Sequence, residues 1–289
     1  MKYQHLLLLI ALFSMSACST TSKMGKKGDP IFIAPVGVQA YSFRNYFPKD
    51  IPGTLDKIQA MGITEIEGSS GRIDAADYRK LCEERGISIP STGASFNDLD
   101  EHPMKVVENA KTLGSKYVMC AWVPHENSGA FSLEDAKRTV EVFNRAGKVL
   151  AENGLTFCYH AHGYEFQPHG DGTLMDYIIQ NTDSKYVSFE MDTFWVQFGG
   201  ADPVALLKKY GDRWKLLHLK DMKKGTKKDL TGHSSVENNV PLGTGEIDMR
   251  GILIEARRIG VAHYFIEDES SAVVEQVPES VTYLKNLRY

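Results

Sequence analysis

Short apolar runs alternate with amphipathic stretches eight times from Val36 to Tyr289, and this alternation limits the folds open to the chain. The runs are rich in β-branched and aromatic residues, as strands are, while the stretches between them carry apolar residues at helical spacing. Strands that are apolar on both faces and separated by helices form parallel sheets covered on both sides. Eight such units in roughly 250 residues predict an α/β fold of the (β/α)8 TIM-barrel type.

The expected strands follow one another at intervals that suit helical connections. They cover residues 36–43, 64–69, 87–95, 116–123, 155–162, 187–196, 214–221 and 263–269. The connection after His218 is longer than the others and carries Lys223, Lys224, Lys227 and Lys228. Long loops at the catalytic face of a barrel usually cover something, so we expect this loop near the site and its lysines on a solvated rim.

The first 18 residues have the order of an export signal. Lys2 precedes an apolar run at residues 6–13, and Ser16 and Ala17 precede Cys18. Eight apolar residues cannot span a bilayer. The segment resembles a bacterial lipoprotein signal peptide with Cys18 as the lipidated residue; a secretory peptide without lipid is the alternative. Both predict an exported, periplasmic protein, with residues 19–33 as a flexible tether and residues 34–289 as the catalytic domain.

The net charge and the cysteine content limit the binding partners and the disulfide bonds that we expect for this chain. The chain has 37 acidic and 33 basic residues, a net charge of −4, so we expect no nucleic-acid partner. Beyond the signal, an odd set of three cysteines remains, Cys82, Cys120 and Cys158, which indicates buried free thiols. We expect contact with a membrane only through the lipid anchor, and leave a homo-oligomer open.

Four candidate metal ligands stand one each at the ends of four expected strands: His162, Asp192, His218 and Glu267. In a TIM barrel the carboxyl ends of the strands converge on one pocket, so these residues become neighbours. Asp192 and Glu267 interrupt apolar runs, and a buried carboxylate is costly unless a cation accompanies it. Mixed imidazole and carboxylate ligands predict one divalent ion, Mn, Zn, Co or Fe, with Mg left open.

The fifth expected strand offers more than one ligand, because YHAHGYEF contains His160, His162 and Glu165. Strand alternation places His160 and His162 on the same side. We assign His162 as the ligand and give His160 and Glu165 supporting or substrate-facing roles.

A base near a bound divalent ion can remove a proton from the carbon beside a carbonyl group that the ion polarises. The candidates are Glu165, Lys220 and His160. Lys220 lies two residues after His218 on the same strand face; an ion pair with Asp221 or Glu246 is its structural alternative. Residues near the strand ends are expected to bind the substrate: Gln39, Tyr41, Arg44, Glu67, Trp122, Trp195 and Asp221.

Six ordered motifs carry a family resemblance: GVQAYSFR, YHAHGYEF, FEMDTFWV, LLHLKD, PLGTGEIDM and FIEDE. They resemble the xylose isomerase-like TIM-barrel superfamily of sugar isomerases and epimerases, and in particular an exported Bacteroidetes-type lipoprotein subgroup of the sugar phosphate isomerase/epimerase family. The resemblance implies metal ligands Glu, Asp, His and Glu, of which Asp192, His218 and Glu267 match three. Tyr159 stands in place of the first Glu, and Trp195 in place of a histidine of the epimerases.

The resemblance implies a metal-dependent isomerase or epimerase acting on a sugar. Export favours an unphosphorylated sugar or keto-glycoside, because sugar phosphates are largely cytoplasmic. The departures at Tyr159 and Trp195 favour the alternative of β-elimination, as in dehydratases and 3-keto-glycoside lyases. A non-catalytic sugar-binding lipoprotein is a further alternative. A nuclease is disfavoured, because the chain is acidic and no histidine accompanies Glu67.

Overall fold

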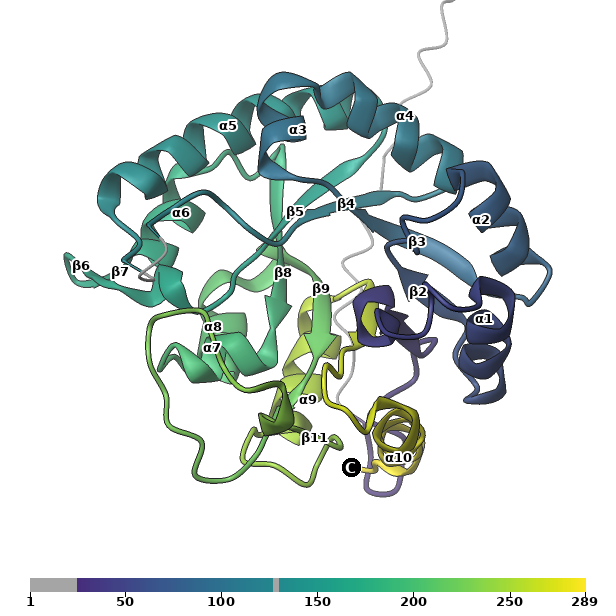
Figure 1. The fold of residues 1–289 in the computed structure, drawn as a ribbon. Helices are drawn as coiled ribbons and strands as arrows, with labels where there is room; N and C mark the ends of the chain where they lie inside the picture. Colours follow the sequence, from purple (N-terminus) through teal and green to yellow (C-terminus); the bar gives the residue numbers. More distant parts are fainter. Residues whose placement is uncertain (1–24, 127–129) are drawn as a thin grey trace, which may run out of the picture.

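The computed structural model describes residues 25–126 and 130–289 (Figure 1). The predicted signal peptide, the lipidation at Cys18 and the tether up to residue 24 lie outside the described residues. None of the helices in the described ranges has the length and apolar character that a bilayer crossing requires.

Within the described residues, eight parallel strands close into a barrel, which confirms the predicted fold. Their order around the barrel is β1-β12-β9-β8-β5-β4-β3-β2. The barrel strands are β1 (Gly37–Gln39), β2 (Glu65–Glu67), β3 (Ser88–Gly93), β4 (Tyr117–Cys120), β5 (Thr156–His160), β8 (Val187–Asp192), β9 (Trp214–Leu219) and β12 (His263–Ile266). Two small hairpins, β6–β7 (Pro168–His169, Gly172–Thr173) and β10–β11 (Asp221–Met222, Asn239–Val240), lie outside it.

Helices surround the barrel, as Figure 1 shows for α1 to α5 along its outer rim. They are α1 (Ile51–Ala60), α2 (Ala75–Glu83), α3 (Phe96–Glu101), α4 (Pro103–Leu113), α5 (Leu133–Glu152), α6 (Leu174–Asn181), α7 (Thr193–Phe198), α8 (Pro203–Tyr210), α9 (Met249–Ile259) and α10 (Val273–Asn286). Many begin with a side-chain cap; Ser132 and Asp135 form a capping box at α5. Cys82, Cys120 and Cys158 are free and buried, as predicted, and burial raises the pKa of Cys82 and Cys120 to about 12.

All eight barrel strands are shorter in the structure than the predicted runs, and for β8 the shortening has a clear local cause. Residues 187–196 read as a single strand, but β8 ends at Asp192 and α7 begins at Thr193. The cause is the Asp192 carboxylate, whose Oδ1 accepts hydrogen bonds from the N–H groups of Phe194 (2.7 Å) and Trp195 (2.9 Å). A carboxylate that caps two free N–H groups starts a helix in spite of the apolar residues that follow.

The described part of the expected tether contacts the barrel domain. Gly28 N–H donates to the Tyr289 carbonyl (3.1 Å), and Ile31 N–H donates to the Leu287 carbonyl (3.0 Å). The Ile31 side chain is buried. The ordered domain therefore begins before residue 34, with its N-terminal segment paired to its C-terminal end.

Gly147 tests how closely α5 packs on the barrel. A Cβ at this position would lie 2.6 Å from the backbone carbonyl oxygen of Tyr186, which cannot move aside as a flexible side chain would. We expect Gly147→Ala to lower the free energy of unfolding by about 1–3 kcal/mol. This loss would occur although alanine has the higher helix propensity, because the added methyl group has no space. Urea denaturation measures it. Gly93→Ala, whose Cβ would meet nothing within 4 Å, is the control; equal stabilities would contradict the prediction.

Candidate active site

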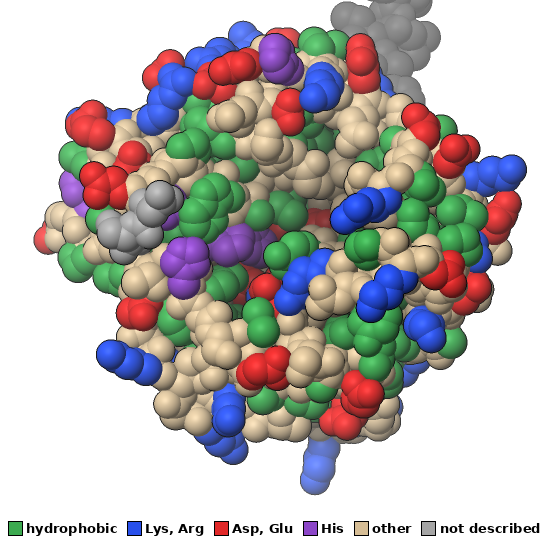
Figure 2. All heavy atoms as spheres, in the orientation of Figure 1, with side chains coloured by type: hydrophobic (Ala, Val, Ile, Leu, Met, Phe, Trp, Pro, Cys, Tyr) green, Lys and Arg blue, Asp and Glu red, His purple; other side chains and the backbone are tan. Residues whose placement is uncertain are grey.

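A cavity of about 450 Å³ opens at the carboxyl ends of the barrel strands. Figure 2 shows this face, with a hollow near its centre and histidine side chains beside it. The cavity is lined by Gln39, Tyr41, Met119, Ala121, Trp122, His160, His162, Trp195, His218, Gly232, His233, Ser234, Glu267 and Glu269. Parallel strands place the site here because their carboxyl ends all open on the same side of the barrel.

Two buried histidines share one carboxylate beneath this cavity. His160 Nδ1 lies 3.1 Å from Glu190 Oε2, and His218 Nε2 lies 3.4 Å from the same oxygen. Glu67 Oε2 also contacts His218 Nε2 at 2.5 Å and accepts from Gln39 Nε2 at 2.6 Å. One nitrogen of each ring is therefore engaged by the acidic groups of the barrel interior.

The other nitrogen of each ring faces a second pair of carboxylates. His160 Nε2 lies 3.7 Å from Asp192 Oδ2, and His218 Nδ1 lies 3.2 Å from Glu267 Oε2. Burial lowers the pKa of His160, so its ring stays neutral, as a metal ligand must be. Four donor groups from β5, β8, β9 and the end of β12 thus meet at the cavity floor.

The site passes a simple test for a cation. Glu67 Oε1, Glu190 Oε1 and Asp192 Oδ2 are buried and have no hydrogen-bond partner within the described residues. Buried carboxylate oxygens without partners are costly, and a divalent ion removes that cost. Two sets of possible ligand atoms each lie within 4.8 Å of one another: His160, Asp192 and His218, and Glu67, Glu190 and His218. The residues present fit a divalent metal ion bound by mixed imidazole and carboxylate groups.

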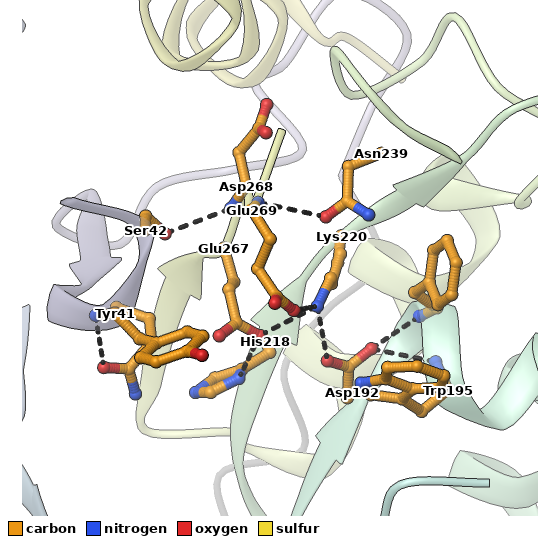
Figure 3. Close-up of polar contacts among 12 residues, drawn as sticks. Tyr41, Ser42, Asp192, Trp195, His218, Lys220, Asn239, Glu267, Asp268 and Glu269 are labelled. Carbon is orange, nitrogen blue, oxygen red and sulfur yellow. Dashed lines mark hydrogen bonds and ion pairs between the residues drawn. The ribbon is translucent and has the colours of Figure 1, made fainter. Parts of the chain in front are cut away.

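A buried lysine completes the cluster (Figure 3). Lys220 Nζ contacts Glu269 and lies 3.3 Å from Glu267 Oε2 and 3.9 Å from Asp192 Oδ2. Burial opposes its charge, but the carboxylates of Glu267, Asp192 and Glu269 outweigh burial and raise the pKa of Lys220. The amine therefore keeps its proton. Its partners are these carboxylates, and not the Asp221 or Glu246 of the sequence-based alternative.

The three candidate residues of the fifth strand have different positions from those we expected. The structure brings His160, and not His162, within ligand distance of Asp192 and His218. His162 lines the cavity, its Nδ1 has no hydrogen-bond partner among the described residues, and burial lowers its pKa to about 3. Glu165 is fully buried outside the cavity lining, where it accepts hydrogen bonds from Tyr159 Oη and the His162 N–H. Burial raises the pKa of Glu165 to about 7.

The residues expected to bind substrate separate into three groups. Gln39, Tyr41, Trp122 and Trp195 line the cavity, and Glu67 lies in the buried acidic cluster. Arg44 lies outside the lining, with its guanidinium 4.7 Å from the Tyr41 ring centre.

Asp221 has a different role from the expected contact with substrate. It is buried, and its carboxylate accepts N–H groups of Met222, Gly243, Gly245 and Ile247 at 2.8–3.2 Å. Its contacts hold the loop at residues 241–247 and do not line the cavity.

Two acidic residues of the site went unnoticed in the sequence. Glu190 precedes Asp192 by two positions, and Glu269 follows Glu267 by two. Alternation along a strand places residues two apart on the same face, so Glu190 could have been found from Asp192. Glu269 lies past the end of β12, where alternation no longer applies.

Comparison with known proteins agrees with this architecture. Residues 55–287 match the family model described as xylose isomerase-like TIM barrel. The chain belongs to this family. It is 27% identical to an inosose dehydratase of Geobacillus kaustophilus (strain HTA426) over 226 residues, 65% of this chain and 69% of the relative. An inosose dehydratase of Bacillus thuringiensis (strain Al Hakam) is 33% identical over 99 residues, 34% of this chain and only 32% of its own length.

Solved structures share the fold. A sugar phosphate isomerase/epimerase from Parabacteroides distasonis ATCC 8503 superposes with a TM-score of 0.72 at 26% identity, covering 87% of this chain and 93% of that one. The IOLI protein, solved with a binding zinc atom, superposes with a TM-score of 0.65 at 15% identity, covering 87% and 95%. The relatives of this chain thus include sugar isomerase/epimerase and dehydratase proteins.

The contacts of Asp221 predict a role in holding its loop. Asp221→Asn replaces one acceptor oxygen by an amide that cannot accept the loop's N–H groups, at a cost of about 1–3 kcal/mol for a buried unpaired donor. We expect faster amide hydrogen exchange at residues 241–247, measured by mass spectrometry. Asp229→Asn, an exposed Asp on the same connection, is the control, and equal exchange in both variants would contradict the role.

Proposed function

We propose that this chain is a divalent-metal-dependent carbohydrate enzyme that removes the proton beside the carbonyl of an unphosphorylated sugar or keto-glycoside. The observation that carries the proposal is the buried group of His160, Asp192 and His218, whose possible ligand atoms lie within 4.8 Å of one another and whose Asp192 Oδ2 has no hydrogen-bond partner within the described residues. The sugar isomerase/epimerase and dehydratase relatives support a carbohydrate substrate.

The metal would be held by His160 Nε2, Asp192 Oδ2, His218 Nδ1 and Glu267 Oε2, with His162 as the alternative to His160. This choice uses the nitrogens that Glu190 and Glu67 leave available. When bound, a divalent ion supplies positive charge that polarises the carbonyl beside the reacting C–H bond. The IOLI protein, which contains zinc, supports the assignment of a metal to this fold.

Side chains of the protein would accept the proton that leaves the substrate carbon. Glu269 lines the cavity and is the carboxylate placed to accept the proton. Lys220 lies outside the lining and keeps its own proton, so it acts on the site through its contacts with Glu269 and Glu267. This differs from the expected use of Lys220 as a base. Glu165 is sealed from the cavity, and the neutral His162 ring is placed to bond a sugar hydroxyl.

The class of reaction depends on where the electrons of the broken C–H bond go. Reprotonation at the same or the neighbouring carbon gives epimerisation or isomerisation. In elimination, the C–H electrons form a carbon–carbon double bond, the bond to the β-oxygen breaks, and the leaving oxygen takes up a proton. The dehydratase relatives favour elimination. No lysine or arginine lines the cavity among the described residues, which favours a substrate without phosphate.

The reaction can be tested by NMR in D2O with 3-keto-glucosides and free ketoses. Aglycone release would assign elimination, and deuterium incorporation without cleavage would assign isomerisation or epimerisation. We expect His218→Gln and Glu269→Gln to lower the rate by about 10²–10⁴-fold. His263→Gln is the control, because His263 pairs with Glu65 (2.8 Å) at the opposite end of the barrel. Sugar binding without turnover in the metal-loaded protein would instead support a non-catalytic sugar-binding protein.

Glu190 provides a test of the metal site that needs no substrate. Because its Oε2 orients both histidine rings, we expect Glu190→Gln to weaken divalent-metal affinity by about 10–100-fold, measured by titration calorimetry and by metal content after dialysis. Wild type should hold one ion per chain. Glu65→Gln, which also removes a carboxylate from a histidine, is the matched control; unchanged affinity in Glu190→Gln would reject this metal site.

A further inference from the structure

The mouth of the cavity carries unusual apolar exposure. Among the described residues, five large hydrophobic side chains are exposed, and the two aromatic ones are Tyr41 (55% exposed) and Trp122 (44%). Both line the active-site cavity. Single exposed hydrophobic residues are common, but exposed aromatic residues gathered at one cavity indicate a binding surface.

Trp122 is held in place by neighbouring rings. Its ring centre lies 4.6 Å from that of His125, 5.1 Å from Tyr164 and 5.9 Å from His162. His125 in turn packs on Tyr164, with ring centres 4.0 Å apart. A surface that is already fixed loses little conformational entropy when a ligand packs against it.

Tyr41 stands on another side of the mouth. It follows β1, whereas Trp122 follows β4, and these strands are three positions apart in the closed ring of strands. The Arg44 guanidinium lies 4.7 Å from the Tyr41 ring centre and donates to the Glu269 carbonyl (2.7 Å), which fixes the tyrosine beside the site. Figure 3 shows Tyr41 near the cluster formed by His218, Glu267 and Lys220.

The cavity therefore has two regions of different chemistry. The floor is polar, with His160, His218 and Glu267 beside the buried Trp195, and the mouth is aromatic. Its volume of about 450 Å³ lies in the ~300–1,000 Å³ range of pockets that enclose drug-sized ligands, which leaves space beyond one sugar ring.

We propose that Trp122 and Tyr41 form a second subsite that binds a ring-shaped aglycone, so that the substrate is a glycoside whose sugar occupies the polar floor. This rests on the proposed function for the identity of the floor ligand. An aromatic ring and the C–H face of a sugar ring share the apolar surface that an indole recognises. In an elimination reaction the aglycone is the leaving group, and this subsite would hold it.

Binding of unreactive glycosides tests the subsite without turnover. Methyl β-glucoside, phenyl β-glucoside and cellobiose would be titrated calorimetrically into the metal-loaded protein. We expect phenyl β-glucoside to bind about five- to tenfold more tightly than methyl β-glucoside. A similar gain for cellobiose would show that the subsite accepts a sugar ring, and its absence would restrict the subsite to aromatic aglycones.

The variants assign the preference to its residues. Trp122→Ala should remove the preference for the phenyl glycoside while leaving methyl glucoside affinity within about twofold, and Trp122→Phe should restore most of it. Met104→Ala, at an exposed hydrophobic residue outside the cavity, is the control. Equal binding of phenyl and methyl glycosides by wild type, no binding of either, or an equal loss for both in Trp122→Ala would overturn the proposal. A phenyl preference without any reaction of keto-glycosides would keep the subsite and reject the proposed reaction.

Discussion

The burial of acidic groups at one end of the barrel is the constraint on which the rest of the site depends. Glu67, Glu190 and Asp192 are removed from water, and each keeps an oxygen without a hydrogen-bond partner in the described structure. Burying carboxylates in this way is strongly unfavourable unless positive charge accompanies them. Lys220 supplies part of that charge, and so does His218, whose pKa the carboxylates of Glu190, Glu67 and Glu267 raise against the effect of burial. A divalent ion would supply the remainder.

Barrel closure makes this concentration of charge geometrically possible. Glu67 on β2 reaches His218 on β9 across the barrel interior, although 151 positions separate them in sequence. Glu190 spans from β8 to the neighbouring strands on both sides, touching His160 on β5 and His218 on β9. The acidic groups thus act as supports that set the orientation of the imidazole rings, which is what a metal site requires of its surroundings.

The sequence predicted the barrel because periodicity and strand spacing report the backbone directly, and all eight expected strands are present. It also located Asp192, His218 and Glu267 at the strand ends. On the fifth strand we chose His162, whereas the structure brings His160 close to Asp192 and His218. Strand alternation places both histidines on the same side and does not tell which of them lies deeper. Asp221 was expected to contact substrate because it lies near a strand end, but it instead accepts hydrogen bonds from Gly243 and Gly245, which form only when a distant loop folds back.

The pairing of the two ends of the described chain fixes where they lie relative to the cavity. Residues 28–31, which precede β1, pair with Leu287 and Tyr289, which follow α10. This pairing lies at the end of the barrel where β1 begins, opposite the carboxyl-end face that holds the cavity. Both ends of the described chain therefore lie away from the cavity mouth and leave it open to substrate.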